Sequence, residues 1–136
     1  RFKPVYSVMT AASLPAVSKL HYHQQRRLLD VTFSSGELVS FTAEFLRVHS
    51  PSAEVRGHGT PKLVTNKKQV AIKKLQLAGH YAVKLVFDDG HDSGLYSWHY
   101  LHQLAQQHDS LWQQYLQQLT EANANRDDVI AVRVQY

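Results

Sequence analysis

The stretch that decides the fold runs from Tyr81 to Leu101 and reads YAVKLVFDDGHDSGLYSWHYL. Apolar side chains alternate with other residues in its first part, at Val83, Leu85 and Phe87. Alternation over about four to eight residues is the period of a strand with one buried face. The first part of the stretch therefore predicts a strand whose apolar side faces the core of the protein.

The second part of the same stretch predicts a tight turn and then a helix. Residues 88–90 read Asp-Asp-Gly, and Gly90 accepts a positive φ while aspartate side chains bond to the nearby backbone. Residues 94–97 can then return antiparallel, and Ser97 has the side chain of a helix N-cap. We therefore predict a hairpin followed by a helix that begins near Trp98, with a His-Asp pair at the bend.

An earlier segment follows the same pattern. Residues 29–36 read LDVTFSSG and residues 83–90 read VKLVFDDG, and each continues into a second strand and the start of a helix. In the earlier copy, Thr42 is the expected N-cap of a short helix. The pattern indicates a degenerate internal repeat of strand, turn, strand and helix, and a chance likeness of two hairpin–helix units is the alternative. Two such units can bury their apolar faces against each other.

Two more segments alternate as strands do. They are residues 19–23 and residues 70–77, the latter with a bulge expected at Lys73-Lys74. Between the two copies of the repeat, residues 49–66 are rich in Ser, Pro and Gly and show no periodicity, which predicts a long loop. Long loops in compact domains are often functional, so this loop is a candidate binding surface.

The C-terminal third predicts one long or broken helix. Two apolar stripes at helical spacing run from Tyr100 to Leu119, and Asp109 or Ser110 is the expected second N-cap, where the helix breaks near His108. The apolar face either packs on a sheet or joins two copies of the chain as a homodimer through the C-terminal helix. Together these segments predict an α+β fold of antiparallel β-hairpins packed with a long or broken C-terminal α-helix.

Composition limits the class of protein. The chain has 136 residues, of which 43% are hydrophobic and 19% charged, as in an ordinary globular domain. We expect a single domain over residues 17–122, after a flexible lead over 1–16 and before a tail over 123–136 that offers an edge strand. No segment is apolar enough to cross a membrane, and the absence of cysteine excludes disulfides and fits a cytoplasmic protein.

Charge and motifs argue against two further classes. The formal charge of +4 permits weak attraction to polyanions, but the basic pairs at 26–27, 67–68 and 73–74 lack interleaved aromatic residues, so nucleic acid is not an expected partner. The chain also lacks a Gly-x-Ser-x-Gly elbow, a phosphate-binding glycine loop and a spaced His-x-Asp iron motif. We therefore do not expect an enzyme.

The nine histidines raise the question of a metal site. His21 and His23 share one strand face, and His99 and His102 share one helix face, so either pair offers two imidazoles to a transition ion. A firm site needs a third and a fourth ligand, which the sequence does not supply at a recognisable spacing. The best remaining metal candidate is a loop set that comprises His49, His58, His91 and Asp92.

Two phrases of the sequence resemble a known family. Residues 46–59 read LRVHSPSAEVRGHG and residues 88–98 read DDGHDSGLYSW, and together they resemble the gamma-butyrobetaine hydroxylase-like N-terminal domain over about residues 17–107. Stand-alone bacterial members of that family look like this chain. Similar domains precede the catalytic domain of carnitine-pathway 2-oxoglutarate oxygenases and accompany a P-loop carrier of iron–sulfur clusters in plastids. The resemblance implies a non-catalytic binding or adaptor module.

The resemblance also bears on a cofactor. In the oxygenases this domain holds a structural zinc ion through three cysteines and a histidine, which fall here on Ser50, Ser52, Val55 and His91. Only the histidine is kept, and two hydroxyls with one imidazole do not make a closed zinc site. We therefore expect no zinc and no other cofactor. Ser50 and Ser52 are instead expected to bond the loop backbone, with His91 in the same corner.

The same two phrases mark the surface on which we expect a protein partner or a small ligand to bind. It combines the loop at 47–59 with the bend at 88–98, and Trp98 is its apolar anchor. Its polar residues are expected to be Arg47, Ser50, Ser52, Glu54, Arg56, His58, His91 and Asp92. If these residues serve binding alone, Arg56→Ala and His91→Ala leave the melting temperature nearly unchanged. The alternative is a metal-binding protein that holds zinc or iron through His91 and neighbouring histidines.

Overall fold

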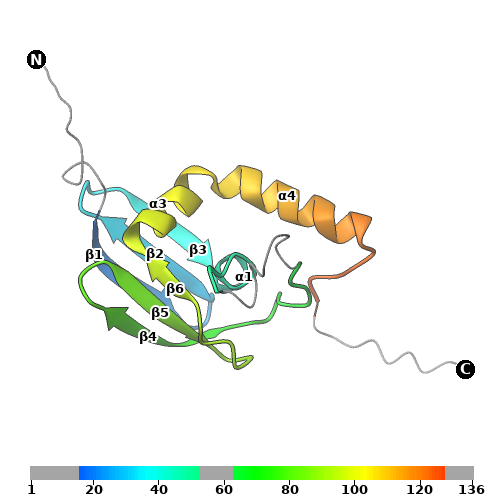
Figure 1. Ribbon diagram of the computed structural model, residues 1–136, viewed down its shortest axis with the longest axis horizontal. Coiled ribbons are helices and arrows are strands. Elements are labelled where there is room, and N and C mark those ends of the chain that lie inside the picture. The colour runs from blue at the N-terminus through cyan, green and yellow to red at the C-terminus, as the bar shows by residue number, and fades with distance from the viewer. Residues whose placement is uncertain (1–15, 53–62, 128–136) are drawn as a thin grey trace, which may run out of the picture.

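The first half of the chain forms a three-stranded antiparallel sheet and a short helix. The structure, a computed structural model, describes residues 16–52 and 63–127 (Figure 1). The first sheet has the strand order β1-β2-β3 and leads into a helix; the elements are β1 (Val17–His23), β2 (Leu28–Phe33), β3 (Leu38–Thr42) and α1 (Ala43–Val48). Thr42 caps α1 as predicted, because its Oγ1 accepts a hydrogen bond from the Phe45 N–H at 3.0 Å.

The second half repeats this arrangement and then adds a helix. Its sheet has the order β4-β5-β6, and the elements are β4 (Ile72–Ala78), β5 (Ala82–Phe87), β6 (Leu95–Ser97), α3 (Trp98–Gln106) and α4 (His108–Glu121). Ser97 caps α3, with its Oγ accepting from the Tyr100 N–H at 3.0 Å. The predicted hairpin, N-cap and helix start are therefore confirmed, as is the α+β fold class.

The internal repeat is confirmed in the turns as well as in the order of elements. Gly36 lies at φ +95° and Gly90 at φ +93°, a region that side chains disfavour. The Gly36 N–H donates to the Phe33 carbonyl at 2.8 Å, and the Gly90 N–H donates to the Phe87 carbonyl at 3.1 Å. The two hairpins thus close with the same local geometry, which explains why both sequences read Phe-x-x-Gly at this point.

One core lies between the two sheets and is closed by the helices. The alternating apolar residues of β2 and β5 are buried together with residues of α1 and α3: Leu29, Val31, Phe33, Phe45, Leu46, Val83, Leu85, Phe87, Leu101 and Leu104. A smaller cluster joins α4 to the end of α1, where Tyr115 and Leu119 pack on Val48. The apolar stripe of α4 is thus used within the chain, and the homodimer through this helix stays a prediction.

Two details differ from the sequence prediction. α4 begins at His108, and neither Asp109 nor Ser110 caps it; both lie in its first turn after Gln107. The reason is that the chain hardly leaves helical geometry, since the Leu111 N–H donates to the Gln107 carbonyl at 2.8 Å and no extended residue separates the helices. β4 begins two residues later than expected, and its predicted bulge is confirmed as a register shift at residues 72–74.

The described part of the C-terminal tail packs back on the domain. The Asn66 N–H donates to the Asn125 carbonyl at 2.8 Å, and the Lys68 N–H donates to the Arg126 carbonyl at 2.7 Å. The strand predicted at 129–134 and most of the predicted lead lie outside the described residues. Of the helices described, none has the length and apolar composition that a bilayer crossing requires.

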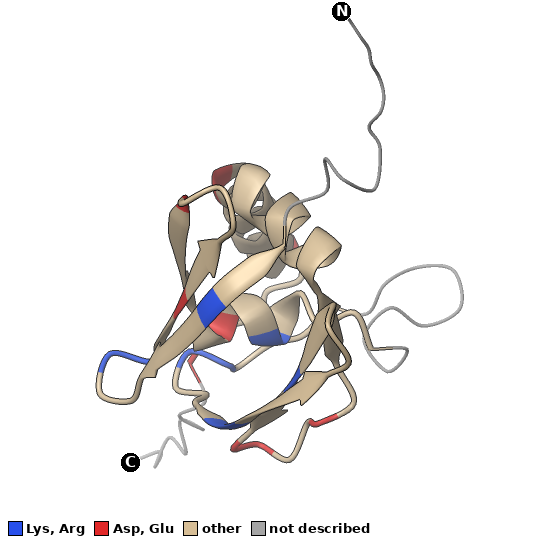
Figure 2. Ribbon diagram, turned by 90° about the vertical axis from the view of Figure 1, so that its left-hand side faces the viewer, with Lys and Arg blue, Asp and Glu red and all other residues tan. Residues whose placement is uncertain are grey.

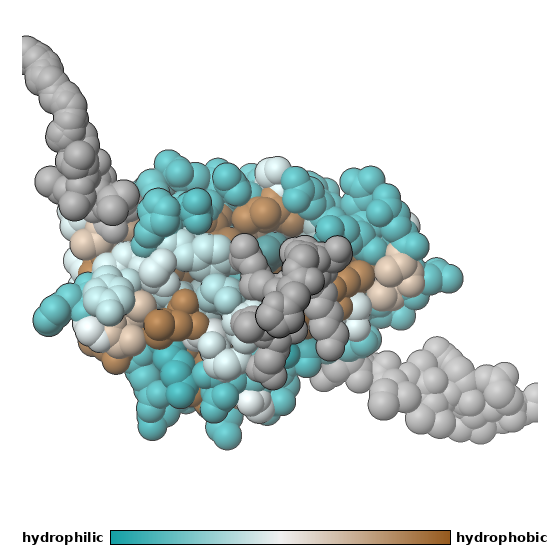
Figure 3. Space-filling model, in the orientation of Figure 1, coloured by the Kyte–Doolittle hydropathy of each residue, from teal (hydrophilic) through white to brown (hydrophobic). Residues whose placement is uncertain are grey.

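Surface charge and hydropathy are both mixed. Acidic and basic residues are interspersed on the face shown in Figure 2 rather than gathered into one field. On the face shown in Figure 3, apolar residues form small separate patches among hydrophilic ones. Neither view presents a single dominant charged or apolar surface.

Candidate functional site

The corner predicted from the sequence is present, and it is buried. Ser50 follows α1 and His91 follows β5, and the Ser50 Oγ lies 2.9 Å from the His91 Nε2. The Ser50 Oγ also accepts a hydrogen bond from the Ser52 N–H at 3.2 Å, so its predicted bond to the loop backbone is confirmed. The Ser52 hydroxyl pairs with the Ser93 hydroxyl at 2.7 Å. Ser50 is 0% exposed, and Ser52 and His91 are nearly as buried.

Close packing beneath the corner holds Ser50 in place. A Cβ atom built on Gly94 would lie 2.5 Å from the Ser50 Oγ and 3.1 Å from the Tyr96 ring, so only glycine fits there. The buried Tyr96 hydroxyl donates to the Leu46 carbonyl in the last turn of α1. Because this carbonyl has no partner within the helix, the tyrosine satisfies it and fixes the exit of the chain toward Ser50.

The corner does not fit a zinc ion. Two serine hydroxyls and one imidazole are a poor donor set for Zn²⁺, which is bound in proteins by thiolates, imidazoles and carboxylates. Ser50 and His91 already share a hydrogen bond. Among the described residues, no group of three His, Cys, Asp or Glu ligands includes His91. The described residues of the corner thus join two loops through hydrogen bonds.

An ion-pair network lies beside the corner and was not predicted as a unit. The Asp89 Oδ2 lies 2.8 Å from the Arg47 Nε and 2.7 Å from the Lys67 Nζ, and the Asp89 Oδ1 accepts from the His91 N–H at 3.0 Å. Burial alone would raise the pKa of Asp89, but the hydrogen bonds from Lys67, His91 and Arg47 outweigh it and hold this pKa at about 2. The network connects α1, the turn after β5 and the segment before β4.

The structure brings together some of the predicted site residues and separates others. Arg47, Ser50, Ser52 and His91 meet at the corner, and the exposed Asp92 lies beside it in the turn after β5. Glu54, Arg56 and His58 lie outside the described residues.

Trp98 is not part of this corner, contrary to its predicted role as the anchor. It lies beyond the other end of β5, where its backbone N–H donates to the Tyr81 carbonyl and its Nε1 to the His80 carbonyl, both at 2.8 Å. The physical reason is the antiparallel return of β6, which carries the chain from the His91 end of β5 back to the Tyr81 end before the helix begins.

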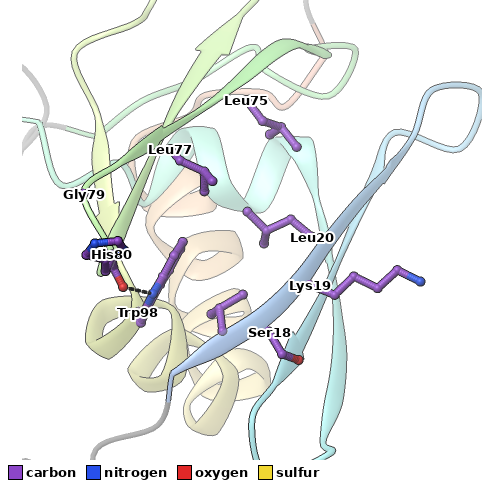
Figure 4. A pocket seen from close by; sticks show the side chains of 9 residues that line it. Ser18, Lys19, Leu20, Leu75, Leu77, Gly79, His80 and Trp98 are labelled. Atoms are coloured by element: carbon purple, nitrogen blue, oxygen red, sulfur yellow. Dashed lines mark hydrogen bonds between the residues drawn. The ribbon is translucent and has the colours of Figure 1, made fainter.

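Trp98 instead lines a pocket between the two sheets. The sheets approach each other where the Ile72 N–H donates to the Tyr22 hydroxyl at 3.0 Å, and they leave a space of about 450 Å³ between β1 and β4 farther along. Its lining comprises Val17, Ser18, Lys19, Leu20, Leu75, Leu77, Gly79, His80 and Trp98. Leu20, Leu77 and the indole of Trp98 point into the space, and the Lys19 side chain points away from it (Figure 4).

Sequence reasoning missed this pocket, which we call the β1–β4 groove. Alternation marks Leu75 and Leu77 as core-facing residues, yet Leu77 is 72% exposed because the two sheets splay apart beside it. The angle between two sheets is a tertiary property with no local signal.

Comparison with known proteins gives one family and several related structures. The family described as "Gamma-butyrobetaine hydroxylase-like, N-terminal" matches residues 20–102. Two structures solved by NMR in solution are 46% and 44% identical to the chain, with TM-scores of 0.76 and 0.77; they cover 96% and 91% of it and 98% of their own chains. No curated protein matches the chain in sequence.

A third related structure has a stated source. It is the crystal structure of a protein of unknown function from Acidithiobacillus ferrooxidans, which is 32% identical to the chain. The match covers 66% of this chain and 92% of that one, with a TM-score of 0.58. These structures support the fold, and their descriptions assign no activity.

Proposed function

Because the chain belongs to the family of gamma-butyrobetaine hydroxylase-like N-terminal domains, we propose that it is a non-catalytic module that binds another protein. The proposed binding site is the β1–β4 groove, and its occupant is an extended segment of the partner that carries an apolar side chain. The observation that supports this proposal is the position of Trp98 between two sheet edges that splay apart.

The backbone of the groove suits an extended occupant. β1 and β4 are the outer strands of their sheets. An outer strand presents backbone N–H and C=O groups along its unpaired side, and an extended peptide satisfies such groups by adding as a further strand. Each of the two strands is seven residues long, which offers an edge of ordinary length to a short segment of a partner.

The side chains of the groove select an apolar group. Leu20, Leu77 and Trp98 line it, and its volume of about 450 Å³ is within the usual range for binding pockets. Lys19 is the sole Lys or Arg among the lining residues, and it points outward. A polyanion finds little complementary charge in such a groove, whereas an apolar side chain of a partner gains by covering Leu77.

The corner at Ser50 is a weaker candidate surface for the same role. The Ser50 hydroxyl is hydrogen-bonded to the His91 Nε2 and the Ser52 hydroxyl to the Ser93 hydroxyl, and Ser50, Ser52 and His91 are buried. A partner would have to break these bonds before using those atoms, at the cost of leaving buried polar groups without their present hydrogen bonds. The same bonding gives little support to the alternative of a metal-binding protein that uses His91.

A peptide selection followed by mapping tests the proposal. Peptides that bind the full chain are selected from a displayed library of random 12-residue segments, and the bound surface is mapped by NMR chemical-shift changes. The expected binders are extended and carry an apolar residue, and the shifts fall on residues 17–20, 75–80 and the indole of Trp98. Binders that map to the corner, or the failure to select any binder, would contradict the groove as the site.

A matched pair of variants sharpens this test. Leu77→Lys places a charge in the groove, and we expect it to weaken a selected peptide at least tenfold. Leu95→Lys is the control, because Leu95 is also an exposed leucine, 48% accessible, on the opposite edge strand of the same sheet. Equal losses in the two variants would argue against a specific role of the groove.

A further inference from the structure

Two histidines and an aspartate meet on the outer face of the first sheet, and none of the three belongs to the corner at Ser50. His21 lies opposite Asp30 in the register of β1 and β2, and His23 is two residues further along the same face of β1. The His23 Nε2 lies 2.8 Å from the Asp30 Oδ2. One ligand atom from each of the three residues lies within 4.8 Å of the others.

The chemistry of this cluster is that of a transition-metal site. Imidazole nitrogens and one carboxylate oxygen are ligands that Zn²⁺ and its neighbours in the first transition row accept. Two ligand atoms of one tetrahedral zinc ion stand about 3.3 Å apart when the metal–ligand distances are about 2.0 to 2.1 Å. The His23–Asp30 pair is already that close, and the exposed His21 ring needs to move by roughly 1.5 Å at most.

A neighbouring residue already orients the carboxylate. The Ser40 Oγ donates to the Asp30 Oδ1 at 2.6 Å, which leaves the Oδ2 directed at His23. Outer hydrogen bonds of this kind hold metal ligands in position and strengthen binding.

We propose that His21, His23 and Asp30 bind one divalent ion of the zinc class, with Ser40 as a positioning residue. Three protein ligands leave a fourth tetrahedral position open to water or to a group of another molecule, as in exchangeable or catalytic zinc sites and unlike closed structural ones. The site lies on the solvent side of β1 and β2, so an ion reaches it without any movement of the core. It is independent of the β1–β4 groove as a proposed peptide site.

Two features of the site lower its affinity for a cation: a nearby positive charge and an existing hydrogen bond between two of the ligands. Lys19 is on the same face of β1, two residues from His21, and a strand places such residues about 7 Å apart. That charge is exposed, and salt screens it only in part, because about 7 Å is slightly less than the Debye length of about 8 Å at physiological ionic strength. The hydrogen bond between His23 and Asp30 also has to be exchanged for two metal–ligand bonds. Both effects lower the affinity without blocking the site.

Calorimetric titration of ZnCl₂ into the full chain, purified without a histidine tag, tests the proposal at pH 7.5. We expect one equivalent to bind, and His21→Ala, His23→Ala and Asp30→Asn each to lower the affinity at least tenfold. Ser40→Ala is expected to give a smaller loss. The control is the double variant His80→Ala/His99→Ala, which removes two exposed histidines elsewhere and should leave the affinity within about twofold.

A second measurement separates loss of the site from loss of the fold. Zinc that binds the folded state raises the melting temperature, and this shift should vanish in His21→Ala, whose exposed position leaves the core intact. The proposal is overturned if the wild-type chain binds no zinc at 100 µM metal, about a hundredfold above a typical micromolar affinity. It is also overturned if the control variant loses affinity as much as the three ligand variants do.

Discussion

The Ser50 Oγ and the His91 Nε2 share a buried hydrogen bond of 2.9 Å across 41 positions of sequence. This bond joins the exit of α1 to the turn after β5, and so connects the two copies of the repeat at one corner. Because the bond is buried, removing either side chain costs the other a hydrogen bond that water does not readily replace. We therefore expect Ser50 and His91, two of the residues predicted to serve binding, to contribute to folding.

The first prediction concerns this hydrogen bond. We expect Ser50→Ala and His91→Ala each to lower the free energy of unfolding by about 1 to 3 kcal/mol, as for other buried polar groups that lose a partner. Urea unfolding followed by circular dichroism measures the loss. Asp92→Ala is the control, because Asp92 is the exposed neighbour of His91. If His91→Ala is no more destabilising than the control, the residue serves binding alone, as the sequence had suggested.

The second prediction concerns the glycine beneath the corner. In Gly94→Ala the new methyl group would lie 2.5 Å from the Ser50 Oγ, which is held by its own hydrogen bonds and cannot move aside freely. Overpacking of this kind costs about 1 to 3 kcal/mol. Removing the hydroxyl by Ser50→Ala relieves the contact, so Gly94→Ala should cost less in that background. Additive losses in the double-mutant cycle would contradict the proposed contact.

Local chemistry explains which parts of this structure can be predicted from the sequence. The caps at Thr42 and Ser97, the turns at Gly36 and Gly90, and the alternation of the strands each depend on a few consecutive residues. These features can therefore be predicted from the sequence alone. The corner was predictable for a different reason, because the two family-like phrases that contain Ser50 and His91 occur together.

Long-range packing explains what the sequence could not give. The β1–β4 groove depends on how far two sheets splay, and the exposure of Leu77 follows from that angle. The cluster of His21, His23 and Asp30 depends on the register of two strands, which brings the third ligand opposite the first. The spacing of His21 and His23 identified them as possible ligands from the sequence. No sequence pattern distinguished Asp30 from the other residues of its strand.

The third prediction concerns acid stability and Asp89. Its folded-state pKa of about 2 lies below the ordinary value of 3.8, so the ionised carboxylate stabilises the fold above about pH 4. That contribution is lost as the pH falls from about 4 to about 2. Allowing for solvent screening, we expect Asp89→Asn to lower the free energy of unfolding by about 1 kcal/mol at pH 6 and by much less at pH 2.5.

Urea unfolding at the two pH values measures this difference. Asp92→Asn is the matched control, since it removes an exposed carboxylate from the same turn. We expect the control to behave like the wild-type chain at both pH values. A loss in Asp89→Asn that is equally large at pH 6 and at pH 2.5 would show that the network acts through packing and not through the ionised carboxylate.

The last prediction concerns the ion pair that fastens the C-terminal segment. The Arg126 Nε and Nη2 donate to the two carboxylate oxygens of Glu44 at 2.9 Å each, and the guanidinium lies 5.2 Å from the centre of the Trp112 ring. Glu44 is 5% exposed, so Arg126→Ala leaves a buried carboxylate without its partner. The loss should be about 1 to 3 kcal/mol, below the 3 to 5 kcal/mol typical of fully buried pairs, because the Arg126 side chain is itself 36% exposed.

Tryptophan fluorescence shows whether this loss arises at the expected place. The chain has two tryptophans, so in a Trp98→Phe background the emission comes from Trp112 alone. Arg126→Ala removes the cation above that ring, and we expect the emission of the folded protein to shift together with the loss of stability. Arg26→Ala is the control, because it removes an exposed arginine from the turn after β1. If the two variants are equally stable and leave the emission of Trp112 unchanged, the pair with Glu44 does not hold the segment, and the hydrogen bonds of Asn66 and Lys68 to the tail must hold it instead.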